Sequence, residues 1–264
     1  MISRQINVQK LALSSMLAAL GVILASPVFA FIVPLFGVPA VRIDLIAIPT
    51  IVAGLLLGPI YGLTVGILTD VLGFFLFTHV FGAYHFGFTL NLALAGLSAG
   101  LLIKLFRKSS QKFPIFMINI VFLSLLSLLS ILYIVLTDSI SINGTAFTLS
   151  EGFKWVFTGS IIAFFLVLLW TMIISRKKKP KDTVHIDRII FIVLFIEVFV
   201  VILLTPIWVF QLYQAPPYIA GVFLRIIRAM WLIPLKAYLI YSITLVAKSM
   251  YKESSHSVIQ KSSL

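Results

Sequence analysis

Five ionisable side chains lie inside long apolar stretches of the sequence. They are Asp70, Glu197, Arg225, Arg228 and Lys236. A charge at the centre of a bilayer costs about 2.5 kcal/mol or more, so such a side chain must face a partner or a wet cavity. These five residues are therefore the first candidates for structural ion pairs or for a binding site.

Three of the five lie in the last apolar stretch. Arg225 and Lys236 are separated by roughly three helical turns and therefore share a face of the helix. Counted at about 1.5 Å per residue from the outer helix ends, Glu197 and Lys236 both lie roughly 20 Å deep. Asp70 and Arg228 both lie roughly 10 Å deep by the same count. The matching depths predict one structural ion pair at each level.

Two arginines remain near the expected outer mouth. Arg225 is left without an obvious acidic partner, and Arg42, at the expected outer start of the second helix, has only its neighbour Asp44. Surplus cations at one mouth attract anions. The alternative interpretation is that the long side chains extend to lipid phosphates.

Aromatic and hydrogen-bonding side chains gather at the same mouth. The loop 81–91 contains Tyr84, His85, Thr89 and Asn91, and Trp208 faces it from the end of the seventh predicted helix. Such rings are also typical of an interfacial aromatic belt, which is the alternative. Combined with cations, aromatic faces and hydrogen-bond donors suit a flat heteroaromatic acid.

The composition requires a membrane. Of 264 residues, 61% are hydrophobic and 11% charged, whereas a soluble domain has roughly 45–50% and about 25%. The absence of cysteine excludes thiol chemistry. The net charge of +12 collects at the ends of apolar runs, a positive-inside pattern that requires no nucleic acid. With no phosphate loop, paired-histidine zinc helix or serine elbow, we expect no catalytic residue and no metal.

About eight apolar runs predict an all-α membrane protein with both termini cytoplasmic. The runs are Leu11–Pro34, Ile43–Leu57, Pro59–Phe77, Phe86–Phe106, Pro114–Leu136, Trp155–Ser175, Ile189–Gln211 and Val222–Ala247. A signal peptide is the alternative interpretation of the first run, but that run exceeds the roughly 7–15 apolar residues of such peptides.

Four parts follow from the distribution of polar residues. Residues 1–107 hold four helices, 108–181 form an inserted helical pair with a basic cytoplasmic end, 182–250 hold the last two helices, and 251–264 form a polar tail expected to be disordered.

Glycines at one-turn spacing in the second and third runs predict close helix packing. Small residues including Ser15 and Ala19 give the first helix a flat face that can dock another helix.

Three stretches together resemble the substrate-binding S components of energy-coupling factor (ECF) vitamin transporters, most closely the folate-type branch. Ser15-Met16-Leu17-Ala18-Ala19-Leu20 looks like the family's alanine-x-x-x-alanine docking motif, with serine in place of the first alanine. The second stretch runs from Arg42 through Ile48-Pro49, Gly58-Pro59 and Thr69-Asp70 to the loop Tyr84 to Gly96. The third comprises Trp208, Ala215-Pro216, Leu224-Arg225-Ile226 and Ile233-Pro234.

The resemblance implies a six-helix core carrying two additional central helices, in a multi-pass protein of a bacterial cell membrane. Such a chain binds a vitamin from outside and docks, through Ser15 and Ala19, on a transmembrane scaffold subunit served by two cytoplasmic ATPases. It then topples in the membrane so that its site opens inward. The chain itself would be no enzyme and would bind no cofactor, because ATP is used by the partner ATPases.

For folate, the resemblance implies specific roles at the mouth. Arg225 and Arg42 would hold carboxylates, Tyr84 and Trp208 would stack on ring faces, and Thr89 and Asn91 would bond the heterocycle. His85 belongs to the same substrate-binding set. Its segment, His85-Phe86-Gly87, departs from the phenylalanine-proline-glycine that the folate branch tends to have.

Three alternatives stay open. The ligand can be another vitamin, such as pantothenate, a pyridoxine-like compound or riboflavin. The protein can instead be a membrane enzyme or an ion-coupled carrier that works alone, with Asp70 and Glu197 as proton or cation sites. It can also be a scaffold without transport activity, whose central helices bind another protein.

Overall fold

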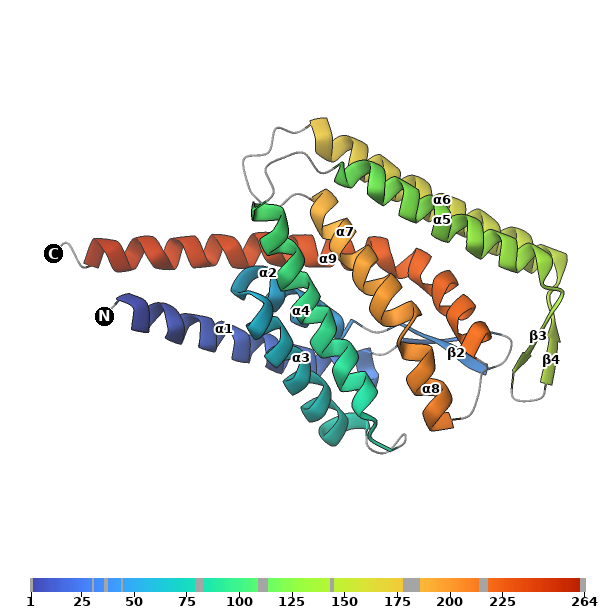
Figure 1. The fold of residues 1–264 in the computed structure, drawn as a ribbon, viewed down its shortest axis with the longest axis horizontal. Helices are drawn as coiled ribbons and strands as arrows, with labels where there is room; N and C mark the ends of the chain where they lie inside the picture. The colour runs from blue at the N-terminus through green and yellow to red at the C-terminus, as the bar shows by residue number, and fades with distance from the viewer. Residues whose placement is uncertain are drawn as a thin grey trace.

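The computed structural model describes residues 2–29, 31–35, 38–43, 45–78, 83–108, 114–142, 145–177, 186–213 and 218–261. Helices dominate this part of the chain and two short antiparallel β-hairpins join some of them (Figure 1). The elements are α1 (Ile2–Leu24), η1 (Pro27–Phe29), β1 (Phe31–Leu35), β2 (Val38–Ile43), α2 (Ala47–Leu57), α3 (Pro59–Gly73), η2 (Phe74–Thr78), α4 (Phe86–Lys108), α5 (Ile115–Leu136), β3 (Ser139–Ile142), β4 (Thr145–Thr148), α6 (Glu151–Lys177), α7 (Ile186–Ile196), η4 (Glu197–Ile202), α8 (Thr205–Tyr213) and α9 (Tyr218–Lys261).

Six helical segments of the described residues are long and apolar enough to cross a membrane. They are Pro59–Phe77, Phe86–Arg107, Ile115–Leu136, Glu151–Ile174, Ile186–Leu212 and Gly221–Ala247. Two further apolar helices, Val8–Leu24 and Ala47–Leu57, are shorter. The helical membrane fold is therefore confirmed, whereas the full number of eight spans stays a prediction.

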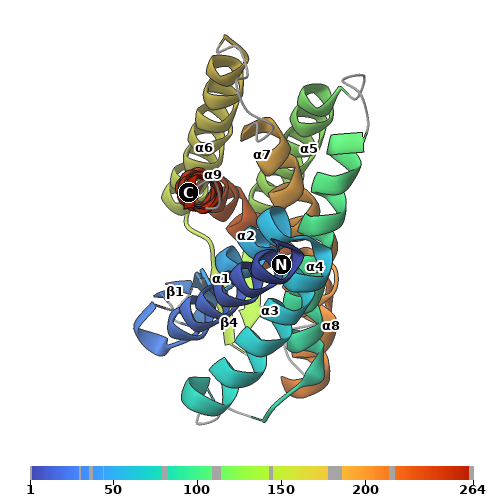
Figure 2. The same cartoon turned by 90° about the vertical axis from the view of Figure 1, so that its left-hand side faces the viewer.

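The helix ends that carry basic residues and the helix ends that adjoin the hairpins lie in different parts of the molecule. In Figure 1 the two chain ends lie at the left, and the end of α4, the start of α5 and the end of α6 lie at the top near the middle, each to the left of the opposite end of its helix. Both hairpins and α8 lie toward the right. Figure 2 looks at the left-hand side and shows the N- and C-terminal helices facing the viewer together. The basic residues at the ends of α4 and α6 lie at these ends, and the side of the membrane that they face stays a prediction.

The first hairpin replaces part of an expected helix. The apolar run to Pro34 predicted a continuous first helix, but α1 ends at Leu24 and β1 pairs antiparallel with β2. Ser26 precedes Pro27, and a residue before proline is displaced from helical geometry. Arg42 therefore lies in β2, opposite Ile32, and not at the start of a helix.

Glycines allow α2, α3 and α4 to pack at backbone distance. A β-carbon at Gly54 or Gly62 would lie 2.3 or 2.4 Å from the carbonyl oxygen of Gly96, and one at Gly66 would lie 2.5 Å from that of Leu92. Gly58 has φ 110° and caps α2 directly before α3 begins. The glycine series thus serves the close helix packing that its spacing predicted.

Gly96→Ala is therefore expected to destabilise the bundle by about 1–3 kcal/mol through overpacking. The added β-carbon would lie 2.1 Å from the Gly62 carbonyl oxygen, and neither backbone can yield easily. Gly159→Ala in α6 is the matched control, because a β-carbon there meets nothing within 4 Å. Thermal unfolding in detergent should show a loss for the first variant only. Equal unfolding temperatures for both variants would contradict the packing argument.

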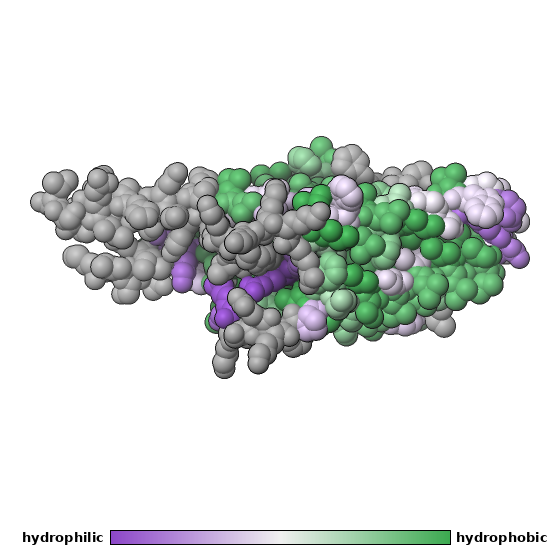
Figure 3. Space-filling model, turned by 90° about the horizontal axis from the view of Figure 1, so that it is seen from above, coloured by the Kyte–Doolittle hydropathy of each residue, from purple (hydrophilic) through white to green (hydrophobic). Residues whose placement is uncertain are grey.

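Helices α5 and α6 pack on α7 and α9 through part of their surface. Asn119 donates a hydrogen bond of 2.9 Å to the carbonyl oxygen of Asp187, and the Tyr133 and Phe223 rings stack with centroids 4.2 Å apart. Their remaining surface is rich in exposed apolar side chains. Figure 3 shows a broad apolar surface between more hydrophilic zones, the pattern of helices exposed to lipid.

The second hairpin closes the other end of this pair. Lys154 donates a hydrogen bond of 2.8 Å to Asp138 and lies 3.4 Å from Glu151. The ammonium holds the pKa of the Asp138 carboxyl below its usual value. The link fixes the start of α6 beside the end of α5.

The last helix is longer than its apolar run. Helix α9 has 44 residues and continues to Lys261. The expectation of a disordered tail from residue 251 is therefore corrected as far as Lys261, because the helix, once formed, is extended cheaply by each added residue.

Candidate functional site

A hydrogen-bond relay joins α3 to the start of α4. Thr89 donates to a carboxylate oxygen of Asp70 at 2.6 Å, and its hydroxyl oxygen lies 2.5 Å from that of Tyr84. Because the Thr89 proton is directed to Asp70, Tyr84 is the donor in the second bond. The Tyr84 ring also stacks on Phe75, with centroids 6.2 Å apart. The relay thus fixes Tyr84 at the end of the bundle that holds the hairpins.

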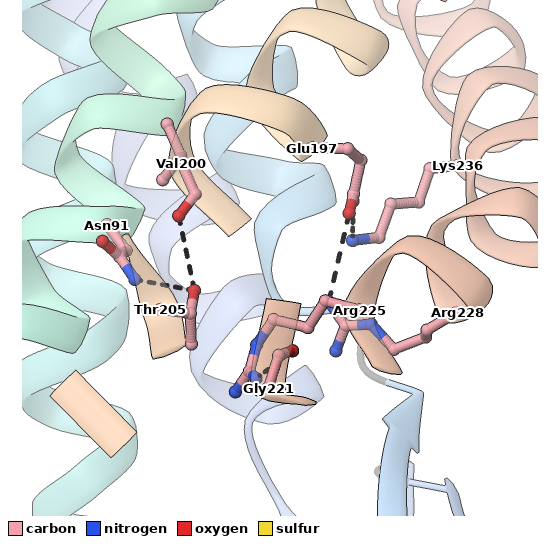
Figure 4. Close-up of polar contacts among 8 residues, drawn as sticks. All are labelled: Asn91, Glu197, Val200, Thr205, Gly221, Arg225, Arg228 and Lys236. Carbon is pink, nitrogen blue, oxygen red and sulfur yellow. Dashed lines mark hydrogen bonds and ion pairs between the residues drawn. The ribbon is translucent and has the colours of Figure 1, made fainter. Parts of the chain in front are cut away.

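A second network joins α4 to α8. Trp208 donates from Nε1 to Asn91 Oδ1 at 3.1 Å, and Asn91 donates from Nδ2 to the hydroxyl of Thr205 at 3.0 Å. Thr205 in turn lies 3.4 Å from the carbonyl oxygen of Val200, as Figure 4 shows. Asn91 therefore holds both the start of α8 and its indole ring.

The indole of Trp208 lies directly against the start of α4. A β-carbon at Gly87 would lie 2.3 Å from the indole ring, so only glycine permits this contact. The His85 ring lies 5.7 Å from Trp208 between centroids, and its Nδ1 accepts a hydrogen bond from the Gly87 N–H at 3.1 Å. The five residues thus form two groups at the start of α4: Tyr84 and Thr89 on the side of α3, and His85, Asn91 and Trp208 on the side of α8.

Arg225 lies on α9, near the first turn of α8. Its guanidinium donates a hydrogen bond of 2.9 Å to the carbonyl oxygen of Gly221. A β-carbon at Gly221 would lie 3.3 Å from Pro206 and 3.4 Å from the Arg225 guanidinium, so this face of α9 packs on the start of α8. Since Thr205 precedes Pro206, α8 connects the aromatic cluster with the cation.

The ion pair between Glu197 and Lys236, which their similar predicted depths in the membrane indicated, is present. Lys236 donates a hydrogen bond of 2.6 Å to Glu197, and each residue is 2% exposed. Glu197 begins the π-helical turn η4, where the widened helix carries its carboxylate toward α9. Among the described residues this is the most deeply buried ion pair.

The shallower ion pair is corrected. Asp70 accepts its hydrogen bond from Thr89, while Arg228 lies 3.9 Å from the second oxygen of Glu197. Residue counts along ideal helices gave similar depths for Asp70 and Arg228. They took no account of the reach of an arginine side chain or of the π-helical turn at Glu197.

Arg42 is placed by its backbone only. Its strand, β2, packs against α9, the helix that carries Arg225, and Figure 1 shows β2 near the start of α9. The Arg42 side chain lies outside the part of the chain that the structure describes. Its role in ligand binding stays a prediction.

Thr205 and the pairing of Arg228 with Glu197 were not expected from the sequence. Thr205-Pro206 within an apolar run was an available signal, since proline interrupts helical hydrogen bonding and a neighbouring hydroxyl can bond a backbone carbonyl, here that of Val200. The described residues contain no group of three or more histidines, aspartates or glutamates arranged to hold a metal ion. The arrangement is compatible with binding: α8 carries a fixed indole, held by Asn91, and its first turn packs near the Arg225 cation.

The predicted docking residues lie on the outer face of α1. Ser15 and Ala19 are exposed, whereas Ser14 and Ala18 are buried against the bundle. The Ser15 hydroxyl bonds the carbonyl oxygen of Leu11 at 2.9 Å, so its polar group is satisfied within the helix. Positions 15 and 19 are therefore small and expose no unsatisfied donor, and they lie among the exposed apolar side chains of Leu11, Met16 and Ile23.

This fold and this cluster define a multi-pass membrane protein with polar, aromatic and cationic groups collected at one end of a helical bundle. Residues 9–162, more than half of the chain, match the family described as "ECF transporter, substrate-specific component". The chain belongs to the ECF transporter substrate-specific component family. A search of curated proteins and a search of solved structures each gave no match.

Family membership makes this chain the substrate-specific subunit of a transporter, a class that associates with an ECF scaffold and ATPase module. The matched residues run through α5 and into α6. They therefore cover part of the segment 108–181, whose interpretation as an insertion stays a prediction.

Proposed function

We propose that the protein is a folate-type S component that captures its vitamin from outside the cell without ATP. The supporting observation is the position of Arg225 beside α8, the helix that also carries the fixed indole of Trp208. A pteridine ring requires flat apolar faces and hydrogen-bonding groups, and a glutamate tail requires cations. These two requirements are met on neighbouring elements at one end of the bundle.

The individual roles are proposed from the family resemblance, and the contacts within the protein refine them for two residues. Arg225 and Arg42 hold carboxylates, while Tyr84, His85 and Trp208 offer ring faces. Thr89 and Asn91 are 3% and 7% exposed, and their polar atoms already bond protein groups. They therefore act first by positioning Tyr84 and Trp208, and contact the heterocycle only by exchanging one of these bonds.

Equilibrium binding to the purified protein tests this proposal. Folate should bind one molecule per chain in detergent without ATP, measured by quenching of tryptophan fluorescence. Pantothenate, pyridoxine and riboflavin form the comparison panel. Tighter binding of any of these three would replace folate as the ligand while keeping the family function. Uptake into vesicles that lack the ATPases would instead support a carrier that works alone.

Docking through α1 gives a separate prediction. Ala19→Trp should lower assembly with the scaffold and ATPase subunits by about tenfold or more, which corresponds to ~1.4 kcal/mol. Vitamin binding should be unchanged, because Ala19 is exposed on the outer face of α1. Val121→Trp is the matched control, since Val121 is 62% exposed on α5. Co-purification of the complex provides the measurement, and normal assembly of the Ala19 variant would contradict the assigned face.

The bacterial cell membrane is the proposed location, with the hairpins and α8 outside. In this orientation the basic ends of the helices lie in the cytoplasm, as the positive-inside pattern requires. Labelling of single cysteines introduced into a chain that has none of its own can check this orientation.

A further inference from the structure

Asp70 is a carboxylate inside a membrane span for which the described residues provide no cation. It lies in the candidate span Pro59–Phe77, and the salt bridges formed within the described part of the chain do not include it. A charged side chain inside a membrane must face a partner or a wet cavity. The position of Asp70 therefore points to a partner from outside the chain.

One of the two carboxylate oxygens of Asp70 is left available. The relay from Tyr84 through Thr89 ends on the other oxygen, at 2.6 Å, whereas an ionised carboxylate can accept about four hydrogen bonds. Asp70 is only partly buried, and within the described residues no donor reaches its second oxygen. A ligand can therefore supply that donor.

Aromatic rings stand at the Tyr84 end of the same relay. The Tyr84 ring stacks on Phe75 with centroids 6.2 Å apart and meets the edge of Phe74 at 5.2 Å. Tyr84 is 39% exposed and Phe75 is 62% exposed, so ring surface is accessible as well as the carboxylate. A carboxylate close to aromatic faces suits a flat ring that carries N–H donors.

Asp70 and Arg225 lie at opposite ends of one series of contacts. Helices α3, α4, α8 and α9 contact one another in this order (Figure 1). Thr89 joins α3 to α4, Trp208 joins α4 to α8, and the first turn of α8 packs near Arg225. The series begins with a carboxylate and ends with a cation. It complements an elongated ligand with N–H donors at one end and a negative charge at the other.

We propose that Asp70 binds the amino-substituted edge of the ligand's heterocycle, so that the site selects a dipolar heteroaromatic compound. Amino or ring N–H groups of the ligand donate to Asp70, and its acidic group binds Arg225. In folate the donors are the 2-amino group of the pteridine and the ring N–H beside it. This inference rests on the proposed function, which assigns the acidic group to Arg225, and it extends that function by naming the residue that recognises the ring.

Folate and an analogue with a methyl group in place of the 2-amino group test this role. The two compounds share the fused rings, the aminobenzoate and both carboxylates. The wild-type protein should bind folate at least about tenfold more tightly, or ~1.4 kcal/mol. Asp70→Asn should lose most of this preference by weakening folate alone, because Thr89 then bonds the amide oxygen and the amide NH2 group faces the ligand. Isothermal titration calorimetry measures both affinities.

A structural role for Asp70 predicts a different result. Asp70→Asn would then weaken both compounds by the same factor and lower the unfolding temperature of the ligand-free protein. The proposed role predicts an unfolding temperature that is unchanged or raised, because the amide still accepts from Thr89 while a charge leaves the membrane span. Glu151→Gln, which removes an exposed carboxylate at the start of α6, is the control and should change neither affinity.

The role of Asp70 can fail independently of the folate proposal. Equal binding of folate and its analogue by the wild-type protein would overturn donor recognition while keeping the folate assignment. If neither compound binds, the folate assignment fails, and pyridoxamine against pyridoxine tests Asp70, since an ammonium group replaces a hydroxyl on the same ring. A preference for pyridoxamine that Asp70→Asn removes would support the role. The absence of such a preference in both pairs would overturn it.

Discussion

Replacing Glu197 by leucine is expected to lower the free energy of unfolding by about 3–5 kcal/mol, the usual cost of leaving a buried charge without its partner. Lys236 is 2% exposed and its hydrogen bond is to this carboxylate. Arg228 faces the same group at 3.9 Å, so the substitution removes the negative charge from both cations. Denaturation of the purified protein by SDS can measure the loss.

Lys236→Met is the informative comparison. It removes one cation but leaves Glu197 facing Arg228, so we expect a smaller loss than for Glu197→Leu. The double variant Glu197→Leu with Lys236→Met should recover part of the stability, because apolar side chains can replace a buried ion pair. A loss for Lys236→Met equal to that for Glu197→Leu would show that Arg228 does not share the carboxylate.

Arg225→Ala is expected to weaken folate binding by at least about 100-fold, or ~2.7 kcal/mol, because a ligand carboxylate would lose a charged hydrogen-bond partner in a poorly hydrated site. Arg225→Lys should restore part of the affinity by returning the charge without the bidentate geometry of a guanidinium. Isothermal titration calorimetry at constant ionic strength provides the measurement.

The folded state of the Arg225 variant should be nearly intact. In the ligand-free structure the guanidinium bonds a carbonyl oxygen of its own helix, four residues earlier. The unfolding temperature without ligand should therefore stay close to that of the wild type. Full folate affinity in Arg225→Ala would remove this residue from the site.

Local composition was sufficient to predict the helices, because apolar length and flanking charges determine which segments can enter a bilayer. It was insufficient where the backbone leaves regular geometry. The run that includes Phe31–Leu35 is as apolar as a helix, yet it forms a strand after Pro27. The π-helical turn at Glu197 cannot be recognised from the residue types or the hydropathy of the segment.

The candidate site residues could be named from the sequence, but most of their contact partners could not. The Glu197–Lys236 contact follows from depth, because both residues need a partner at the same level of the membrane. The bond between Asn91 and Trp208 joins residues 117 apart in the chain, and no local pattern specifies it. Asp70 and Arg228 were paired wrongly because depth alone does not say which helices are neighbours.

Identification of the molecule retained by the purified protein tests the central claim most directly. The protein is produced with the vitamin panel present and without its ATPase partners, and native mass spectrometry measures the bound mass. We predict one heteroaromatic acid per chain in the wild-type protein and none in Arg225→Ala. Retention of a neutral compound, or of the same acid by both proteins, would contradict an anionic vitamin held by Arg225.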